Sequence, residues 1–304
     1  MVWTVFGGVK RKVVRVGSRG SVLALRQTEE VIGRLSRFYP EVQWEVVPIK
    51  TAGDRLAEDP ETAFARGMFV KEVEEALLEG RVDIAVHSFK DLPTELPPGL
   101  TIFAVPERED PRDVLVSRSR KELFTLPAGS TVGTSSVRRK VQLEYLRPDL
   151  RVVPLRGNVS TRLRKMEEGQ VEALVLAAAG LKRLEKEHYI VEHFSPEVVV
   201  PAVGQGALAV EGRVDDPLQE MVRAIHHAAT AWAVEAERDF LRFFGGGCRI
   251  PVGALATVRD NRITLIGMVA QHGVVKKAFI EGPIEERERM AWFLARELGG
   301  GKDG

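Results

Sequence analysis

Residues 82–93 read VDIAVHSFKDLP, and this stretch decides how the rest of the chain is interpreted. We interpret Val82 to Val86 as a compact strand of the type that is buried on both faces. The apolar residues before it, from Phe69 to Leu77, repeat at helical spacing. A helix, then a buried strand, then a polar cluster from His87 to Asp91 indicates a βαβ unit in a mainly parallel sheet.

The same alternation of short apolar runs and helical periodicity continues on both sides of this stretch. Sheets of this kind bind ligands at the carboxyl ends of their strands. Proline and glycine residues punctuate the chain near residue 105 and again near residue 200, so domain boundaries are expected there. The predicted strands are Val13–Val16, Trp44–Ile49, Asp113–Ser117, Ser130–Gly133, Arg151–Leu155 and Ala173–Ala179.

The last third of the chain has a different pattern. A helical stretch from Leu218 to Phe244 leads into a glycine run that ends at Cys248. Alternating strands are expected over residues 253–281, and a last helix from Pro283 to Leu298. This tail of roughly 85 residues is predicted to form a compact α+β domain, which gives the chain three parts.

Composition excludes several classes of protein. A chain of 304 residues with 44% hydrophobic and 29% charged residues can bury several cores without disulfides or a structural metal. Its 44 Lys and Arg residues balance 43 Asp and Glu residues, which argues against a nucleic-acid binder. The one cysteine, Cys248, excludes an intrachain disulfide, and the spacing of His, Asp and Glu indicates no metal site. No apolar run is long enough to span a membrane, so we expect a cytoplasmic protein without a membrane partner.

Polar clusters follow nearly every predicted strand. Each combines small hydroxyl residues with arginine or lysine where a helix begins, and such helix N-termini bind carboxylates or phosphates. One cluster alone is more often a capped helix with solvated arginines, but four at successive strand ends favour a multiply anionic ligand. Neither the phosphate-loop pattern nor the dinucleotide fingerprint is present. The clusters are Gly17–Ser21, His87–Asp91, Gly133–Arg139 and Arg156–Arg162.

Three side chains could carry chemistry. Asp91 is either a salt-bridge or capping residue or a functional carboxylate in a cleft. His87 is more simply interpreted as a buried, hydrogen-bonded histidine than as a catalytic one, because no nucleophile elbow accompanies it. Cys248 precedes Arg249, which favours the thiolate, so a covalent role stands beside that of an inert buried thiol.

Nine segments of the chain, in order, resemble those of the porphobilinogen deaminase family, also called the hydroxymethylbilane synthase family. The resemblance extends over roughly residues 13–300, and several of the segments are long and unusual. The segments are VGSRGSVLAL (16–25), MFVKE (68–72), DIAVHSFKDLP (83–93), EREDPRD (107–113), VGTSSVRRK (132–140), LRGNVSTRL (155–163), AAAGLKRL (177–184), PAVGQGAL (201–208) and GGCRIPVGA (246–254).

The resemblance implies a transferase of tetrapyrrole and haem biosynthesis. Members of the family join four porphobilinogen molecules head to tail with release of ammonia, and then release linear hydroxymethylbilane by hydrolysis. They build this chain on a dipyrromethane cofactor, which a thioether bond holds to one cysteine. The position that matches this cysteine is Cys248, and the position that matches the family's catalytic aspartate, which contacts pyrrole N–H groups, is Asp91.

The resemblance also assigns further residues to the site. Lys90 is expected to orient the reactants beside Asp91 and, with Ser88 and Asp91, to bind the cofactor. The Asp91 carboxylate would stabilise positive charge that develops on a pyrrole nitrogen in a site with little water. Because each pyrrole carries two carboxylates, many cationic and hydroxyl side chains are needed. Cofactor binding is implied for Thr134, Ser135, Ser136, Arg138 and Arg139, and substrate binding for Arg19, Ser21, Arg156, Arg162, Gln205 and Phe69.

The fold that the resemblance implies is α/β, with two periplasmic-binding-protein-like (type II) α/β domains plus a small α+β C-terminal domain. Domain 1 is expected over residues 1–105 with 201–224, domain 2 over 106–200, and domain 3, which carries Cys248, over 225–304. The first two domains would form the walls of a catalytic cleft in a monomer. Charge reversal at Arg138 or Arg156 should then impair cofactor assembly or elongation more than folding, because exposed arginines contribute little to stability.

The chain departs from the family pattern in a few places, and other classes of function are open. Arg66 stands where the family commonly has a lysine, residues 1–12 have no assigned role, and the tail after Gly299 is short. A non-catalytic two-domain carboxylate receptor or sensor would use the same cleft but would have no use for Cys248. A transferase with a transient acyl-cysteine would need a histidine placed to activate Cys248, and none is clear.

Overall fold

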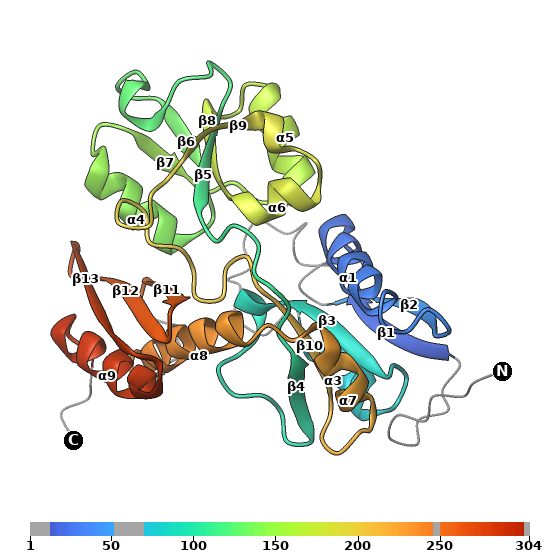
Figure 1. Cartoon of the computed structure of the whole chain (residues 1–304). Coiled ribbons are helices and arrows are strands. Elements are labelled where there is room, and N and C mark those ends of the chain that lie inside the picture. Colours follow the sequence, from blue (N-terminus) through green and yellow to red (C-terminus); the bar gives the residue numbers. More distant parts are fainter. Residues whose placement is uncertain (1–12, 52–69, 246–249, 301–304) are drawn as a thin grey trace. The chain divides into compact units, whose positions relative to one another are not determined.

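The computed structural model describes residues 13–51, 70–245 and 250–300, whose strands form two five-stranded sheets and one three-stranded sheet (Figure 1). The contacts within the chain divide it into two compact units. Unit 1 is Met1–Arg108 with Ala207–Ala231, and unit 2 is Glu109–Gly206 with Trp232–Gly304. Unit 1 contains the first sheet, and unit 2 contains the other two. The three-domain boundaries expected from the sequence stay a prediction.

The sheet of unit 1 is mixed. Strand β1 pairs in parallel with both β2 and β3, whereas β10 is antiparallel to both β3 and β4. The strand expected at residues 82–86 is therefore central, and a strand from late in the chain lies beside it. In spatial order the strands are β2 (Gln43–Ile49), β1 (Val13–Arg19), β3 (Ile84–Ser88), β10 (Leu208–Arg213) and β4 (Leu100–Ala104).

Helices cover both faces of this sheet. Helix α1 (Val22–Leu35) and helix α7 (Leu218–Val222) pack against the face that carries Val86 and Val210. Helix α3 (Lys71–Leu78) packs against the opposite face, where Ala85 meets its apolar side chains. Burial on both faces explains why β3 begins with the apolar residues Ile84 to Val86, and the Ile84 and Val86 side chains each contribute roughly 1.5–3 kcal/mol of burial free energy.

The first sheet of unit 2 repeats this topology. Strand β6 pairs in parallel with β7 and β8, and β5 is antiparallel to β8 and β9. Both sheets thus have the same spatial order. Three parallel strands come first, then one antiparallel strand from elsewhere in the chain, and then a last strand. The strands are β7 (Arg151–Val153), β6 (Thr131–Gly133), β8 (Ala173–Ala177), β5 (Asp113–Ser117) and β9 (Ile190–His193), and the helices are α4 (Val137–Leu146), α5 (Val159–Glu167) and α6 (Ala178–Arg183).

The third sheet is an antiparallel meander of β11 (Val252–Arg259), β12 (Arg262–Gln271) and β13 (Val274–Pro283). One face packs against α8 (Ala228–Arg242) and α9 (Arg287–Glu297), with Phe240 and Leu294 in the core. The predicted fold class, two α/β sheets of one kind plus a small C-terminal α+β part, is confirmed.

Two expectations for the C-terminal part need correction. The helical stretch expected from 218 to 244 is interrupted, because His226 has an extended backbone and its Nδ1 accepts a hydrogen bond from the Val105 amide at 3.3 Å. The last helix begins at Arg287, since Ile284–Glu286 forms a 3₁₀ turn before it. Local periodicity shows neither the interruption at His226 nor the later helix start. A tertiary contact causes the first, and Pro283 before the 3₁₀ turn favours the second.

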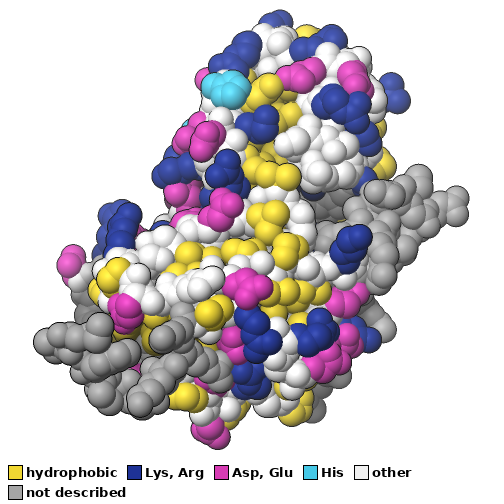
Figure 2. Space-filling model, turned by 90° about the vertical axis from the view of Figure 1, so that its right-hand side faces the viewer, with side chains coloured by type: hydrophobic (Ala, Val, Ile, Leu, Met, Phe, Trp, Pro, Cys, Tyr) yellow, Lys and Arg dark blue, Asp and Glu magenta, His cyan; other side chains and the backbone are white. Residues whose placement is uncertain are grey.

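The charge pattern of the surface agrees with the near-zero net charge. On the face in Figure 2, Lys and Arg side chains are interspersed with Asp and Glu side chains. None of the helices within the described ranges is both long enough and apolar enough to cross a bilayer.

Candidate functional site

The carboxyl end of β1 leads directly into helix α1. Ser21 caps this helix, because its Oγ accepts a hydrogen bond from the Ala24 amide at 3.3 Å. The first turn of α1 contains no acidic residue, so its backbone amides face no side-chain anion from that turn. Arg19 and Ser21 therefore lie at a helix N-terminus, where a carboxylate binds favourably.

The carboxyl end of β3 carries Ser88 and a 3₁₀ turn from Phe89 to Asp91. Ser88 and Gln27 of α1 exchange hydrogen bonds of 2.8 and 3.0 Å between the serine hydroxyl and the amide. The Phe89 ring is buried, which anchors the turn and leaves Lys90 and Asp91 half-exposed. A guanidinium nitrogen of Arg19 lies 3.9 Å from a carboxylate oxygen of Asp91. The structure thus brings these predicted residues of unit 1 to one edge of its sheet.

In unit 2, three hydroxyl residues follow β6, and the side-chain oxygen of each makes a hydrogen bond. Thr134 Oγ1 accepts from the Ser136 amide at 3.2 Å, and Ser135 Oγ donates to the Leu155 carbonyl at 2.8 Å. Ser136 caps α4, whose first turn contains no acidic residue. Gly133 is needed here, because a Cβ atom would lie 3.0 Å from side chains of Leu155 and Leu174. The turn therefore has a rigid backbone around the N-terminus of α4.

Arg138 and Arg139 are buried against Asp113, the first residue of β5. Arg138 Nη1 lies 2.6 Å from one carboxylate oxygen and Arg139 Nη2 lies 2.7 Å from the other. Gln205 Nε2 donates to the same carboxylate at 2.9 Å. Burial alone would raise the pKa of Asp113, but the two guanidinium groups hold it well below its usual range.

This network corrects one expectation about mutants. Arg138 is 7% exposed, so charge reversal there would place an uncompensated charge in the interior and damage the fold. Sequence reasoning also did not single out Asp113, although it lies in the segment EREDPRD and begins a strand. The signal that could have identified Asp113 is an acidic residue at the first position of a predicted strand. The cofactor-binding roles of Arg138 and Arg139 stay a prediction.

The remaining predicted cations are Arg162 in helix α5 and Arg156 just before it. Asn158 caps it by accepting from the Thr161 amide at 2.9 Å, after Gly157 has turned the chain with a φ of +115°. Arg162 Nε donates to the Gly157 carbonyl at 2.7 Å. Removal from water, together with the nearby charge of Arg139, lowers the pKa of Arg162 to about 10. Arg156 is half-buried at the same end of the helix.

These groups fit a ligand that carries several carboxylates. Two helix N-termini without acidic first turns lie at the strand ends of unit 2, and the charge of Arg162 is disfavoured by its surroundings. A carboxylate placed beside Arg162 would offset both the lost hydration and the repulsion from Arg139. The donor set of guanidinium groups, hydroxyls and backbone amides is therefore suited to the acetate and propionate groups of a pyrrole.

Two predicted site residues, Phe69 and Cys248, lie outside the described residues, as do Arg66 and residues 1–12. Within the described residues no group of His, Cys, Asp and Glu side chains could hold a metal ion.

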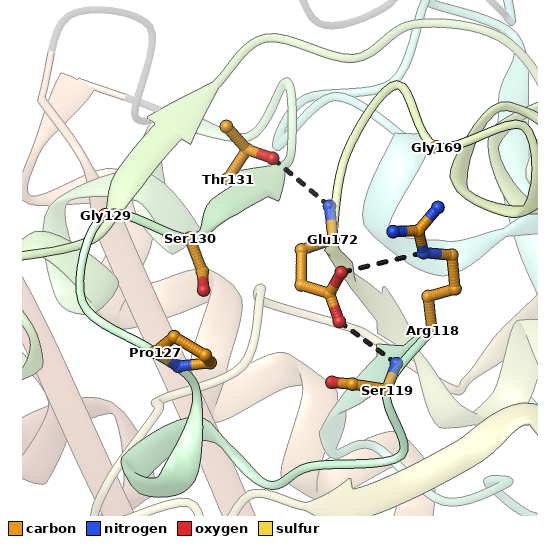
Figure 3. Close-up of a pocket in the computed structure, with 8 residues that line it drawn as sticks. All are labelled: Arg118, Ser119, Pro127, Gly129, Ser130, Thr131, Gly169 and Glu172. Carbon is orange, nitrogen blue, oxygen red and sulfur yellow. Dashed lines mark hydrogen bonds and ion pairs between the residues drawn. The ribbon is translucent and has the colours of Figure 1, made fainter.

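A cavity of about 400 Å³ lies in unit 2 (Figure 3). Thr131, the first residue of β6, and Glu172, just before β8, place it at the amino ends of the parallel strands. Glu172 contacts the Ser119 amide at 3.0 Å and the Arg118 guanidinium at 3.7 Å, as Figure 3 shows. Its ionic side chains thus pair with each other, and none of the predicted binding residues that the structure describes lines it.

The repeated sheet topology and the arginine- and hydroxyl-rich strand ends define a class, the α/β proteins that bind anionic small molecules. A family model described as the porphobilinogen deaminase dipyromethane cofactor binding domain matches residues 14–221, and one for the porphobilinogen deaminase C-terminal domain matches residues 231–299. The chain belongs to the porphobilinogen deaminase family. It is a transferase of tetrapyrrole biosynthesis with a dipyrromethane cofactor domain and porphobilinogen as its substrate, which confirms the resemblance.

Curated relatives match over nearly their whole length. The porphobilinogen deaminase of Syntrophotalea carbinolica is 47% identical over 94% of this chain and 92% of its own length. That of Thermus thermophilus is 49% identical over 94% of this chain and 95% of its own. This membership disfavours the alternative of a non-catalytic carboxylate receptor.

Solved structures with a similar arrangement include periplasmic proteins. A periplasmic binding protein of Salmonella typhimurium is 13% identical with a TM-score of 0.40, and the match covers 72% of this chain and 94% of that one. The VFT2 domain of Bordetella pertussis BvgS is 15% identical with a TM-score of 0.40, over 71% and 87% of the two chains. The strand orders, rather than these distant likenesses, carry the description of the fold.

Proposed function

We propose that Asp91 is the catalytic carboxylate of this transferase and that Cys248 carries the dipyrromethane cofactor through a thioether bond. The observation that carries this proposal is the position of Asp91 on a short turn at the end of a buried central strand. Its carboxylate lies 3.9 Å from the guanidinium of Arg19, and Lys90 precedes it in the same turn. A fixed anion among cations can stabilise positive charge on a pyrrole nitrogen while the cations hold the carboxylates.

The other predicted residues bind and orient in this proposal. When bound, the dipyrromethane supplies the pyrrole to which the first substrate is joined. Arg19 and Ser21 offer a cation and a helix N-terminus in unit 1. The backbone amides at the N-termini of α4 and α5 offer further carboxylate sites in unit 2. These sites account for the expected roles of the residues around them. These residues are Thr134, Ser135, Ser136, Arg156 and Arg162, with Arg138, Arg139 and Gln205 holding the α4 end through Asp113.

The finer course of the reaction follows from the same proposal. Four porphobilinogen units are joined with loss of ammonia, and linear hydroxymethylbilane is released by hydrolysis. The attachment needs a free thiol at Cys248, the only cysteine of the chain, and a reducing compartment keeps it free. We therefore place the enzyme in the cytoplasm, and we propose that it acts as a monomer.

The substitution Asp91→Asn tests the catalytic role. It keeps the size of the side chain and removes its charge, so we expect kcat to fall by about 10²-fold or more with a smaller effect on KM. The melting curve should match that of the wild-type enzyme, and the intact mass should still include the cofactor, because the change lies on the half-exposed turn of unit 1. Glu95→Gln, an exposed neighbour, serves as the control. A folded, cofactor-loaded Asp91→Asn enzyme with near-normal kcat would contradict the proposal.

A further inference from the structure

Three ionisable side chains that the proposed reaction does not use are buried together on one face of the sheet in unit 1. They are Glu74 of α3, His87 of β3 and Glu211 of β10, which are 7%, 4% and 0% exposed. Charged groups are rarely buried so completely unless a partner or a function retains them. Their arrangement therefore needs a physical account.

The strand register brings His87 and Glu211 together. His87 is paired with Ala209 and Glu211 with Ala85, so the two side chains are diagonal neighbours on the same face. Nε2 of His87 lies 3.0 Å from Oε2 of Glu211. Helix α3 covers this face and adds Glu74 to the pair.

The polar atoms of the three side chains are poorly satisfied by other groups. Within the described part of the chain, both carboxylate oxygens of Glu211, Oε1 of Glu74 and Nε2 of His87 are buried without an aligned hydrogen bond. Two fully ionised carboxylates at this depth would be strongly unfavourable. The two carboxylates are therefore expected to share one proton, which leaves a single buried negative charge beside His87.

Other charged groups on the surrounding elements are paired elsewhere or lie nearer the surface; Arg15 of β1, the other neighbour of β3, pairs with Asp83 at 3.0 Å. Arg213, two residues further along β10, donates to the carbonyls of Leu77 and Val82 at 2.7 and 2.9 Å and pairs with Asp216. Strand β4, the other neighbour of β10, reads LTIFA and has no titratable side chain. The remaining charged residues of α3, namely Lys71, Glu72 and Glu75, are half-buried or exposed.

Glu74 is the group that retains the proton. Its burial and the nearby charge of Glu211 raise the pKa of Glu74 to about 7, and the effect of His87 is smaller and opposite. A neutral Glu74 leaves the Glu211 carboxylate next to the His87 ring, 3.0 Å from its Nε2. This distribution avoids a second buried negative charge.

The pair also lies at the base of the proposed catalytic turn. His87 precedes the turn by two residues, and the Phe89 amide donates to the Ala207 carbonyl, just before β10, at 3.0 Å. Strand β10 thus holds the end of β3 through a backbone bond at the turn and through the Glu211 carboxylate below it. A shift of His87 would move the backbone that carries Lys90 and Asp91.

We propose that Glu211 is a positioning residue for the turn with Lys90 and Asp91, acting through His87, and that Glu74 holds the proton that lets Glu211 keep its charge. The effect on turnover rests on the proposed role of Asp91. The sharing of the proton does not depend on it.

The effect on turnover is tested with Glu211→Gln in the full-length, cofactor-loaded enzyme. We expect kcat to fall by about 10-fold, with KM nearly unchanged and the cofactor mass retained, because a small displacement of the turn reduces rate rather than binding. If this variant does not fold, Glu211→Asp, which keeps the charge but withdraws it from His87, takes its place. A folded Glu211 variant with unchanged kcat would overturn the positioning role.

The shared proton is tested by infrared spectroscopy. We expect the carbonyl band of a buried, protonated carboxylic acid at pH 6, its loss in Glu74→Gln and its titration at lower pH in Glu211→Gln, since the charge of Glu211 raises the pKa of Glu74. Glu75→Gln, on the exposed side of the same helix, should keep the band. Absence of the band, or its persistence in Glu74→Gln, would refute the shared proton. If the band behaves as expected while Asp91→Asn keeps normal turnover, the proposed function fails and the proton cluster stands.

Discussion

Arg139 and Asp113 form a buried ion pair in which Nη2 and Nε of the arginine lie 2.7 and 3.0 Å from one carboxylate oxygen. Arg138 binds the other oxygen of the same carboxylate, so one acid satisfies two cations at the start of helix α4. The arrangement fixes the helix N-terminus to β5 and to Gln205. A carboxylate of the protein thus organises the end of the sheet at which carboxylates of a ligand are expected to bind.

Asp113→Asn should destabilise the protein strongly. Loss of the charge leaves two guanidinium groups buried without their counter-ion, and breaking a buried pair costs about 3–5 kcal/mol. Denaturant unfolding measures this difference, with Glu144→Gln, in an exposed ion pair on α4, as the control that should change little. A free energy of unfolding within about 1 kcal/mol of the unmodified chain would contradict the structural role of the network.

The same carboxylate predicts a loss of stability in acid. Because the pKa of Asp113 is lowered in the folded state, its contribution is fully present above its ordinary value of 3.8 and is lost as the pH falls below that value. Asp113→Asn should therefore flatten the acid limb of the stability curve. Unfolding curves between pH 5 and pH 2, roughly the range in which carboxylates titrate, measure the effect.

Glu74 predicts a dependence in the opposite direction. Its folded-state pKa is raised from 4.5 to about 7, so the stabilisation is fully present below pH 4.5 and is lost as the pH rises through about 7. The difference corresponds to about 3 kcal/mol between pH 4.5 and pH 8. Glu74→Gln should remove this decline and be more stable than the unmodified chain at pH 8. An unchanged decline in that variant would exclude Glu74 as its source.

Arg162→Gln should reduce turnover more than stability. The lost hydrogen bond to Gly157 is offset by relief of the repulsion from Arg139, so we expect a change of at most about 1 kcal/mol in the free energy of unfolding. A binding role predicts at least about a tenfold loss of kcat/KM, the scale of one charge-assisted contact. The matched control is Arg164→Gln on the exposed side of the same helix. Normal kcat/KM in a stable Arg162→Gln enzyme would show that Arg162 does not bind the substrate.

Cys248→Ser tests the covalent attachment. We expect the purified wild-type enzyme to be heavier than its sequence by one dipyrromethane and to react with no thiol reagent, since Cys248 is its one cysteine. The serine variant should have the mass of its sequence and should lose turnover. A wild-type enzyme whose mass equals that of its sequence and that still turns over substrate would disprove the thioether.

Much of the site was predictable from local sequence. The segment 82–86 and the following HSFKD cluster indicate a buried strand with polar residues at its end. Strand β3 with its turn is that structure, although it runs from Ile84 to Ser88, two residues later than expected. Ser21, Ser136 and Asn158 form the helix caps expected of such residues before helical periodicity. These features depend on contacts within a few residues, which local patterns record.

The tertiary structure alone decided which charges meet. Arg138 and Arg139 look like exposed arginines in the sequence, but Asp113, 25 residues earlier in the chain, holds them in the interior. Glu211 becomes a neighbour of His87 only because β10 crosses back to pair with β3 from more than a hundred residues away. Local periodicity reports burial and secondary structure, whereas the partner of a buried charge is set by strand order and register, and both arise from contacts between distant segments.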